Sequence, residues 1–538
     1  MKSAQTILLL LASVFVSIEA RAGRCLPVKA RNPEGNYIVP GAMGDIVYRR
    51  VDGRELSLDA YVQKRGSNRP AVIVIHGGNW DTGSRVAFVG QFLEMLTRAG
   101  YNWFSIDYRL NGLPNYRDAV DDLRAAIDFV RCHSKGFRVD PNRIALLGED
   151  AGAHLAALLA AEKPAGVKAA VLIGGFYDLR EAPNLKSQIS NSELLTQASP
   201  IDHIAKGMLA TFVVHGTADR EASPEQAVKL CDAMRQAGAR CDYFPVDGAI
   251  HRPENWLPRQ WGYKDAIVSW LGKELGLAKP DHEPYATNLK KDIVFSPRHG
   301  LKLDAYIPNG RGPFPAVIIA HGGGWEAGDK VTYVTPLFEP LAKAGFAWFS
   351  IDYRLTPQYR HEDQLEDLRE AIRYVQRNAG SFRVDPRRVA ILGESASGQM
   401  VAQVATEKPP GVLAVVSFYG VYDFNAMATD ASPRSIPARL FGITKLDDGA
   451  RAVLRRYSPL HNVRSGMAPI LLIHGTNERL HAQGVAMAKR LAESYAAYDF
   501  YEVENAPHGI ENWEGHPEWM KYKTKLVEWL KQNLAPRR

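Results

Sequence analysis

The chain has 538 residues, of which 46% are hydrophobic, so it is long enough for two or three packed cores and is not expected to be disordered. Its net charge is +7, but the lysine and arginine residues are scattered among acidic ones rather than clustered on one segment. Binding of nucleic acid normally needs a basic patch or stripe, so this pattern argues against a nucleic-acid-binding protein.

The N-terminus has the parts of an export signal: a basic start, an apolar run over residues 7–18 and small residues that end at Ala22. We predict a signal peptide at residues 1–22, and hence a secreted or periplasmic protein with no membrane span after cleavage. The apolar run is shorter than the roughly 20 residues that a spanning helix needs, which disfavours a transmembrane anchor. A lipid anchor on Cys25 is also disfavoured, because Arg24 precedes it where a small residue is required.

All four cysteines lie in the first half of the chain. An even number of cysteines in an exported chain permits two disulfides, and zinc is the weaker interpretation. Cys231 lies in a helical pattern and Cys241 opens a strand-like run soon after it, which predicts a bridge between these two. A bridge between Cys25 and Cys132 follows only by elimination. No cofactor and no metal are expected.

The chain contains the same text twice. Residues 71–179 align with residues 316–424 without a gap, and each residue lies 245 positions from its counterpart. The stretch WFSIDYRL occurs at 103–110 and again, letter for letter, at 348–355. A repeat of about 250 residues is far longer than the period of a solenoid, so it indicates two whole domains.

Short apolar runs alternate with longer helical patterns in each copy, which predicts an α/β fold with a mostly parallel sheet and helices on both faces. We place the first domain at residues 23–278, a linker at 279–290 and the second domain at 291–538. The linker segment is polar, holds prolines and lacks periodicity. In such a fold, ligands bind outside the carboxyl ends of the strands.

The second domain contains the sequence of a nucleophile elbow. An apolar run at 389–392 leads into Gly-Glu-Ser-Ala-Ser-Gly at 393–398 and then into an apolar helix. We predict Ser395 as the nucleophile. The turn is sharp, so small residues are needed two positions away on each side; Gly393 meets this fully and Ser397 nearly so.

A serine nucleophile needs an imidazole base and a carboxylate that fixes the tautomer of that base. His508 follows the last predicted strand, 498–503, where the base belongs. Glu478 follows the strand at 470–473 and is the predicted acid, because the amide of Asn477 cannot stabilise an imidazolium ion.

We expect the backbone amides of Gly323, Gly324 and Ala396 to form an oxyanion hole. Glycines allow the backbone to approach a ligand, and Ala396 opens the helix after the elbow, where amides are free. His321 and His474 are expected to orient turns, and His361 to be a solvated loop or surface residue.

These motifs, HGGGW, DYRL, the elbow, HGT followed by an acid, and a late His-Gly pair, resemble the hormone-sensitive-lipase-like and acetyl-esterase branch of the α/β-hydrolases. The resemblance covers nearly all of both domains and extends to bacterial acetyl-xylan and feruloyl esterases. It implies two tandem α/β-hydrolase domains and a serine carboxylesterase. Its substrates would be small-molecule or polysaccharide-linked esters with short acyl, acetyl or feruloyl groups. An amidase or peptidase with the same triad is the alternative.

The first domain has Asp150 where the second has its serine, while Asp219 and His251 keep the other two places. One interpretation is a degenerate domain that serves as a binding or scaffold module. The other is an aspartate nucleophile, as in epoxide hydrolases and haloalkane dehalogenases, but those relatives carry a large helical cap that is lacking here. Because Asn79 replaces the third glycine of the turn, we expect a distorted oxyanion hole in this domain.

Overall fold

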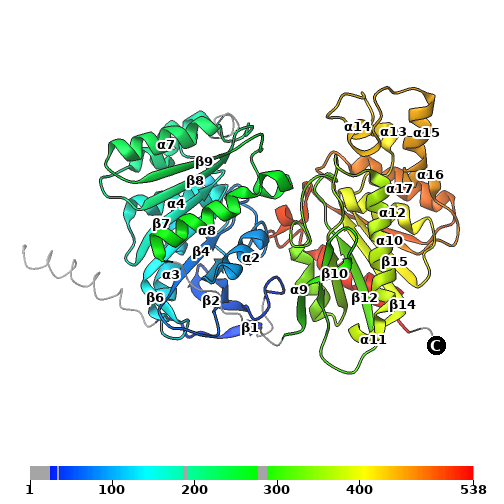
Figure 1. The fold of residues 1–538 in the computed structure, drawn as a ribbon, viewed down its shortest axis with the longest axis horizontal. Coiled ribbons are helices and arrows are strands. Elements are labelled where there is room, and N and C mark those ends of the chain that lie inside the picture. The colour runs from blue at the N-terminus through cyan, green and yellow to red at the C-terminus, as the bar shows by residue number, and fades with distance from the viewer. Residues whose placement is uncertain are drawn as a thin grey trace, which may run out of the picture.

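The computed structural model describes residues 25–32, 36–182, 185, 189, 191–276 and 287–536, which form two α/β units that lie side by side (Figure 1). The predicted signal peptide, residues 1–22, lies outside the described residues, and so does most of the predicted linker at 279–290. No helix in the described ranges is long and apolar enough to cross a membrane.

Among the described residues, the first sheet has nine strands in the order β1-β2-β3-β5-β4-β6-β7-β8-β9. Its first strands pair in antiparallel fashion, and from β5 to β9 all neighbours are parallel. The strands are β1 (Ala30–Asn32), β2 (Met43–Val51), β3 (Arg54–Tyr61), β4 (Arg69–Ile75), β5 (Asn102–Ile106), β6 (Val139–Glu149), β7 (Val167–Ile173), β8 (Ala210–Gly216) and β9 (Cys241–Val246). The helices are α2 (Gly90–Arg98), α3 (Tyr116–Cys132), α4 (Ala151–Glu162), α6 (Ser192–Ala198), α7 (Pro224–Gln236) and α8 (Gly262–Leu275).

The second sheet repeats this topology with eight strands in the order β10-β11-β13-β12-β14-β15-β16-β17. The strands are β10 (Leu289–Ser296), β11 (Leu301–Tyr306), β12 (Phe314–Ala320), β13 (Ala347–Ile351), β14 (Val384–Glu394), β15 (Val412–Phe418), β16 (Ile470–Gly475) and β17 (Tyr498–Val503). The helices are α9 (Thr335–Lys343), α10 (His361–Arg377), α11 (Ala379–Phe382), α12 (Ala396–Ala405), α13 (Phe424–Met427), α14 (Ile436–Phe441), α15 (Asp448–Arg456), α16 (Pro459–Asn462), α17 (His481–Glu493) and α18 (Lys521–Asn533). The predicted fold class, two tandem α/β-hydrolase domains, is therefore confirmed.

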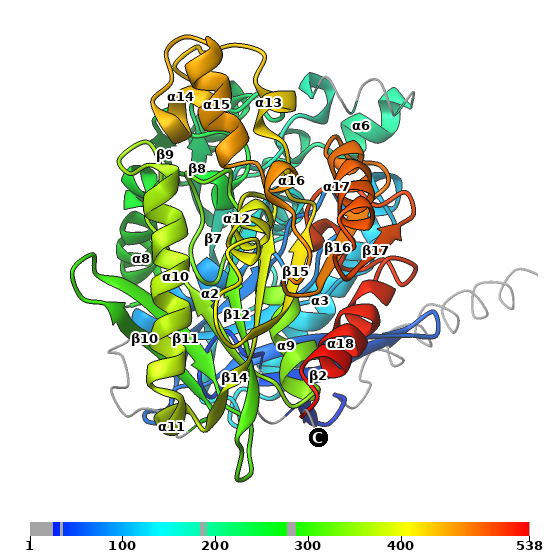
Figure 2. The same cartoon turned by 90° about the vertical axis from the view of Figure 1, so that its right-hand side faces the viewer.

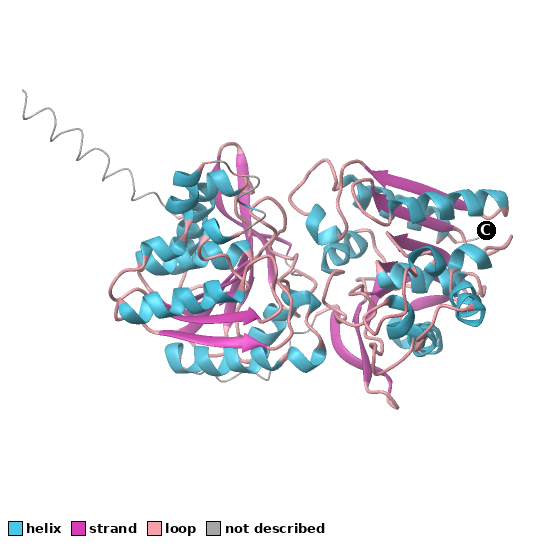
Figure 3. Ribbon diagram, turned by 90° about the horizontal axis from the view of Figure 1, so that it is seen from above, coloured by secondary structure: helices cyan, strands magenta, loops and turns pink. Residues whose placement is uncertain are grey.

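The central strands are apolar along their whole length because helices cover both faces of each sheet (Figure 3). In β4, Val72 and Val74 face α2 and α8, whereas Ile73 and Ile75 face α3, α4 and α7. A continuous apolar run, rather than an alternating one, is what a strand buried on both faces requires.

The two units share one apolar cluster. It contains side chains of α2 and α8 from the first domain and of α9 and α18 from the second. The contacts are reciprocal: the hydroxyl of Thr335 donates to the carbonyl of Val86 at 2.7 Å, and a Cβ on Gly90 would lie 2.5 Å from the carbonyl oxygen of Val331. Gly90 and Thr335 are counterparts in the repeat, as are Val86 and Val331, so the same patch on each domain meets the other, as in an isologous dimer.

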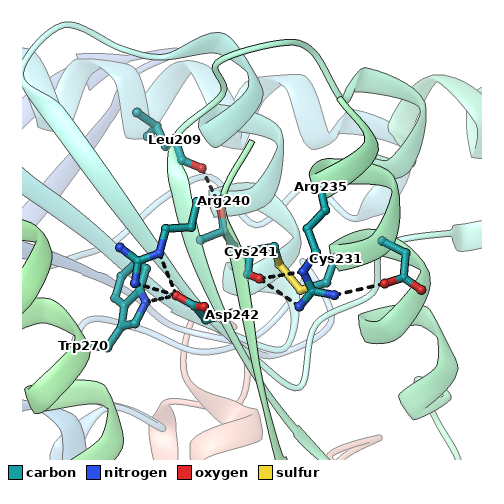
Figure 4. Close-up of a disulfide and its surroundings, with 9 residues drawn as sticks. Leu209, Cys231, Arg235, Arg240, Cys241, Asp242 and Trp270 are labelled. Atoms are coloured by element: carbon teal, nitrogen blue, oxygen red, sulfur yellow. Dashed lines mark hydrogen bonds and ion pairs between the residues drawn. A yellow bond between two sulfur atoms is a disulfide. The ribbon is translucent and has the colours of Figure 1, made fainter. Parts of the chain in front are cut away.

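Both disulfides are present, which confirms the predicted bridge between Cys231 and Cys241 and the pair left by elimination, Cys25 and Cys132. The first of these joins α7 to the start of β9 (Figure 4). Arg235 of α7 also donates to the carbonyl of Cys241, at 3.1 and 2.9 Å, so the helix and the strand are tied twice.

Helices α13, α14 and α15 lie together at one end of the second domain (Figures 1 and 2). They come from the segment between β15 and β16, which follows the carboxyl end of a central strand. They are therefore placed over the edge of the sheet where the predicted site residues lie.

Candidate active site

The elbow of the second domain follows β14, and Ser395 has a φ of 54°, a left-handed conformation that few residues adopt. A Cβ on Gly393 would lie 2.3 Å from the carbonyl oxygen of Ser397, so a glycine is required there. The first domain has Gly152 at the place of Ser397, and Gly152 lies close to the backbone of the last residue of β4. In the second domain the hydroxyl of Ser397 donates to the carbonyl of Ala320 at 2.6 Å, which explains why serine is accepted.

The structure brings together the three side chains that the sequence singled out as a triad. His508 Nε2 lies 2.9 Å from Ser395 Oγ, and His508 Nδ1 lies 2.6 Å from Glu478 Oε2. The carboxylate lies on the turn after β16, the imidazole on the loop after β17, and the hydroxyl on the turn after β14. Three chain segments that are far apart in the sequence therefore meet at one edge of the sheet.

Glu478 is held from two sides, because its other oxygen lies 2.9 Å from His474 Nδ1. Burial raises the pKa of this carboxyl, but the hydrogen bonds with His474 and His508 outweigh that effect and lower it below its ordinary value. Burial in turn lowers the pKa of His474. The carboxylate is therefore ionised at neutral pH, and His474 orients it.

Two further residues position the loop of His508. The ring of Tyr419 packs 4.5 Å from the imidazole, centroid to centroid, and its hydroxyl accepts a hydrogen bond from the amide of Ile510 at 2.8 Å. Asn512 donates to the carbonyl of His508 at 2.7 Å. Neither residue was predicted from the sequence, although the repeat of Glu-Asn-Trp after each late histidine is a signal that could have drawn attention to Asn512.

The glycine turn after β12 has φ values of 97° at Gly323 and 61° at Gly324. A Cβ on Gly323 would lie 2.2 Å from the carbonyl oxygen of Ala327, so this position admits only glycine. Arg439 of α14 donates to the carbonyl of Gly324 at 3.3 Å and pairs with Glu326 at 2.8 Å. A residue of the inserted helices thus supports the turn, which sequence reasoning had not suggested.

In the first domain the same places hold an ionic cluster. His251 Nε2 lies 3.3 Å from Asp150 Oδ1, and His251 Nδ1 lies 2.8 Å from Asp219 Oδ2. Burial alone would lower the pKa of His251, but its hydrogen bonds with the two carboxylates raise it to about 10. Hydrogen bonds with His215 and His251 outweigh burial and bring the pKa of Asp219 to about 2, and the bond with His251 lowers that of Asp150, so a cation lies between two anions at neutral pH.

The expected distortion of the glycine turn in this domain is wrong. The backbone amides of Gly78 and Asn79 converge on Asp150 Oδ2, at 2.8 and 3.0 Å. Asn79 has a φ of 53°, close to that of Gly324, because asparagine tolerates the left-handed region better than most residues. The pair of amides is well formed, and the carboxylate of Asp150 itself fills the place where an oxyanion would lie.

The two sites differ in their exposure as well. The side chain of His251 is 4% exposed, whereas that of His508 is 35% exposed. Substrate can therefore reach the imidazole of the second domain far more readily than its counterpart in the first.

The expectation that His361 lies on the surface or in a solvated loop is also wrong. This residue begins α10 and is fully buried among the rings of Trp325, Phe424, Phe441 and Tyr457. Burial lowers its pKa to about 3, so it is a neutral core residue. Within the described residues, the one cluster with metal-ligand geometry is Cys25, Cys132 and His133, and its two sulfurs form a disulfide.

A cavity of about 410 Å³ opens onto Ser395 and His508, and both domains line it. The first domain contributes residues from the loop before α2 and from the segment on either side of His251. These residues are Phe88, Ile250, Arg252, Glu254 and Asn255. This shared wall could not be predicted from the sequence, because it depends on how the domains pack.

Comparison with known proteins finds related esterases. Part of the chain is 29% identical over 220 residues to esterase LipC of Mycobacterium tuberculosis, which is 38% of this chain and 55% of that protein. Another match, 26% identical over 211 residues, is ethyl acetate hydrolase of Pseudomonas putida, with 36% of this chain and 65% of that protein covered. The chain thus spans about half the length of curated relatives such as LipC. Among solved structures, a Thermogutta terrifontis esterase with propionate bound is 29% identical, covers 45% of this chain and 97% of its own, and has a TM-score of 0.39.

The family model BD-FAE matches residues 58–170 and 303–491, which is one segment in each of the two repeats. The second segment includes Ser395 and Glu478. Because the matched segments together make up more than half of the chain, this protein belongs to the BD-FAE family.

Proposed function

We propose that this protein is an exported serine carboxylesterase that cleaves carboxylic esters in its second domain, with Ser395 as nucleophile, His508 as general base and Glu478 as the acid that orients it. The observation that carries the proposal is the continuous hydrogen-bonded line from Ser395 Oγ through both nitrogens of His508 to Glu478, at 2.9 and 2.6 Å. The names of the related esterases support a carboxylic ester as the substrate.

In the acylation step, His508 Nε2 takes the proton of Ser395 as Oγ attacks the ester carbonyl. The carbonyl π electrons move to oxygen, and the amides of Gly323, Gly324 and Ala396 bind the resulting oxyanion. The intermediate then collapses, the bond to the alcohol oxygen breaks, and His508 returns its proton to the leaving alcohol. A water molecule, activated by His508 in the same way, attacks the acyl-enzyme and releases the acid and free Ser395.

The first domain supports the assignment of the oxyanion hole. The amides of Gly78 and Asn79, the counterparts of Gly323 and Gly324, bind a carboxylate oxygen of Asp150. This anion lies where the oxyanion would be expected in the second domain, because the φ values of the two turns agree. The first domain thus shows how the amides of such a turn bind an anion, which is the role that we propose for the turn of the second domain.

Glu478 supplies the charge that stabilises imidazolium during both steps. Its second contact, with His474, keeps the carboxylate in the plane that His508 requires, so the Nδ1 proton of His508 stays on that nitrogen. A glutamate thereby does the work that an aspartate more often does in this fold.

For the substrate, we propose short acyl esters, including acetyl and feruloyl groups linked to carbohydrate. Two observations support this choice. The cavity is only about 410 Å³, and the inserted segment at 425–462, whose Arg439 contacts the glycine turn that lines the cavity, mixes Arg, Asp, Pro and Gly residues. Export is supported by the signal-like N-terminus and by two disulfides, which form in oxidising compartments.

The first domain is proposed to be non-catalytic. Its anion site is filled by Asp150, and its imidazole is buried. The amides hold Oδ2 of Asp150, and its other oxygen faces His251, whose side chain is only 4% exposed, so we propose that a substrate does not reach this carboxylate.

The test is a panel of acetyl, butyryl, octanoyl and feruloyl esters, with acetylated xylan beside them, assayed with wild type and with Ser395→Ala. We expect turnover of the short esters that is lost in the variant. Hydrolysis that survives in Ser395→Ala would place the activity elsewhere, and a preference for the octanoyl ester or for a matched amide would replace the proposed substrate class.

A further inference from the structure

The cavity above Ser395 is closed on one side by the first domain, and Arg252 is the cation of that wall. This residue directly follows His251 in the sequence, yet its guanidinium reaches across the interface and donates to Asn512 Oδ1 at 3.2 Å. Asn512 in turn donates to the carbonyl of His508. Arg252 therefore lies two hydrogen bonds from the proposed catalytic base.

The guanidinium of Arg252 is held by neighbouring groups, but part of the side chain remains accessible to solvent. It lies over the ring of Phe88, 5.4 Å from the ring centroid to Cζ, and its side chain remains 22% exposed. A planar cation that is fixed by stacking and by a hydrogen bond loses little conformational freedom when it binds a ligand. The exposed part faces the cavity that Ser395 and His508 share.

Four carboxyls lie among the residues that line the cavity, and one of them, Glu254, pairs with Arg252 at 3.9 Å. Glu326 is already paired with Arg439. Burial raises the pKa of Glu254 and Glu511 and brings that of Glu394 to about 7, so burial disfavours the charged form of these lining carboxyls.

Arg479 provides a second cation on the wall that belongs to the second domain. It follows Glu478 on the turn after β16 and is exposed. No hydrogen bond or ion pair joins it to another side chain in the part of the chain that the structure describes. A cavity with two cations of this kind is suited to a carboxylate, which binds arginine strongly.

We propose that Arg252 of the first domain, together with Arg479, binds a carboxylate carried by the substrate, so that the first domain selects esters with an anionic group for cleavage at Ser395. This inference rests on the proposed esterase function and adds the substrate's charge to it. It also gives the first domain a role at the site of the second, although its own triad positions are locked.

The first experiment compares matched esters with the wild-type protein. For the acyl side, mono-para-nitrophenyl glutarate is compared with its neutral methyl ester, and for the alcohol side, para-acetoxybenzoate with methyl para-acetoxybenzoate. A charged hydrogen bond of this kind typically corresponds to roughly a tenfold change in binding. We expect kcat/KM about tenfold higher for the carboxylate in at least one pair, with the difference mainly in KM and reduced by added salt.

The second experiment uses Arg252→Gln and Arg479→Gln, with Arg98→Gln as the matched control. Arg98 also pairs across the interface, with Asp292 at 3.1 Å, but it does not line this cavity. We expect each cavity variant to lower the preference for the carboxylate ester about tenfold while kcat for the neutral ester stays within about threefold. The control should keep the wild-type preference.

Three outcomes would overturn the inference. The first is a wild-type protein that does not prefer the carboxylate ester in either pair. The second is an unchanged preference in Arg252→Gln. The third is an equal loss of kcat on both esters, which would show that Arg252 only positions the loop of His508. If Arg252→Gln does not fold, the comparison of esters with the wild-type protein and the Arg479→Gln variant still test the inference. In all these cases, turnover of the neutral ester that depends on Ser395 leaves the proposed function standing. Absence of such turnover would instead remove the proposed function.

Discussion

The two domains place nearly the same atoms in the same arrangement, but one site is open and the other is locked. In the second domain the nucleophile position holds a hydroxyl, and the imidazole is 35% exposed. In the first it holds the carboxylate of Asp150, which takes the two amides for itself and keeps His251 charged. One residue type thus converts an arrangement suited to bind an oxyanion transiently into one that holds an anion permanently.

The strongest way to break this comparison is to give the second domain the residue of the first. In Ser395→Asp, the new carboxylate should occupy the amides of Gly323 and Gly324 and pair with His508. We expect ester turnover to fall by roughly four orders of magnitude or more, since the nucleophile and the anion site are lost together. Steady-state assays would measure the loss.

Ser395→Ala is the matched control, because it removes the nucleophile without adding an anion. Ser395→Asp should melt at a temperature no lower than that of Ser395→Ala. A marked drop in melting temperature would mean that the second domain cannot adopt the locked arrangement of the first.

A smaller effect is expected when only the charge of the acid is removed. Glu478→Gln keeps the side chain near His474 and His508 but no longer stabilises imidazolium, so kcat should fall by about 10² to 10⁴. Glu502→Gln is the control, because Glu502 of β17 forms a surface pair with His481, the first residue of α17. A loss as large as that of Ser395→Ala, together with a lower melting temperature, would indicate collapse of the turn instead.

The locked site should also contribute to stability in a pH-dependent way. Because the pKa of His251 is about 10 in the folded protein, against an ordinary 6.5, its contribution is fully present below about pH 6.5 and is lost as the pH rises through 10. Asp150→Asn weakens this ion cluster. We expect the variant to be less stable by about 2 to 3 kcal/mol at pH 6, with the difference shrinking toward pH 10.

Urea unfolding across this pH range would measure the difference. Asp121→Asn serves as the control, because Asp121 is an exposed partner of Arg124 and its loss should change stability by less than about 0.5 kcal/mol. A difference between wild type and Asp150→Asn that does not change with pH would show that His251 is not charged in the folded protein. Ester turnover should be unaffected by Asp150→Asn.

The smallest effect is expected from the reverse exchange. Placing Asp150→Ser in the Ser395→Ala background restores a triad in the first domain, but its imidazole is only 4% exposed, so we expect no recovery of turnover. A serine-reactive phosphonate probe would check this directly. Labelling of the new serine, or activity above that of Ser395→Ala alone, would show that the lock is Asp150 alone and not burial.

Several features could be predicted from the chain without a structure. The duplication, the α/β fold, the bridge between Cys231 and Cys241 and the triad positions all follow from patterns along short segments. A strand, a sharp turn and a helix constrain one another locally, so the elbow around Ser395 is evident from six residues. The order of nucleophile, acid and base then follows from the order of the strands.

Predictions from local patterns were wrong where the side chain is surrounded by residues that lie far along the chain, or where a residue tolerates an unusual backbone conformation. His361 opens a helix with polar neighbours in sequence, yet Phe424, Phe441 and Tyr457, far along the chain, bury it. Asn79 was expected to distort its turn, but asparagine tolerates the left-handed conformation that the turn needs.

Sequence patterns therefore sufficed for what each segment does by itself, since hydrophobic period, glycine positions and turn residues act over a few neighbours. Only the folded molecule showed that Asp150 fills its own anion site and that Arg252 lines the cavity of the other domain. Both depend on distances between residues more than 70 positions apart, and the second also on how two domains pack. Such distances are set by the whole core rather than by any one segment.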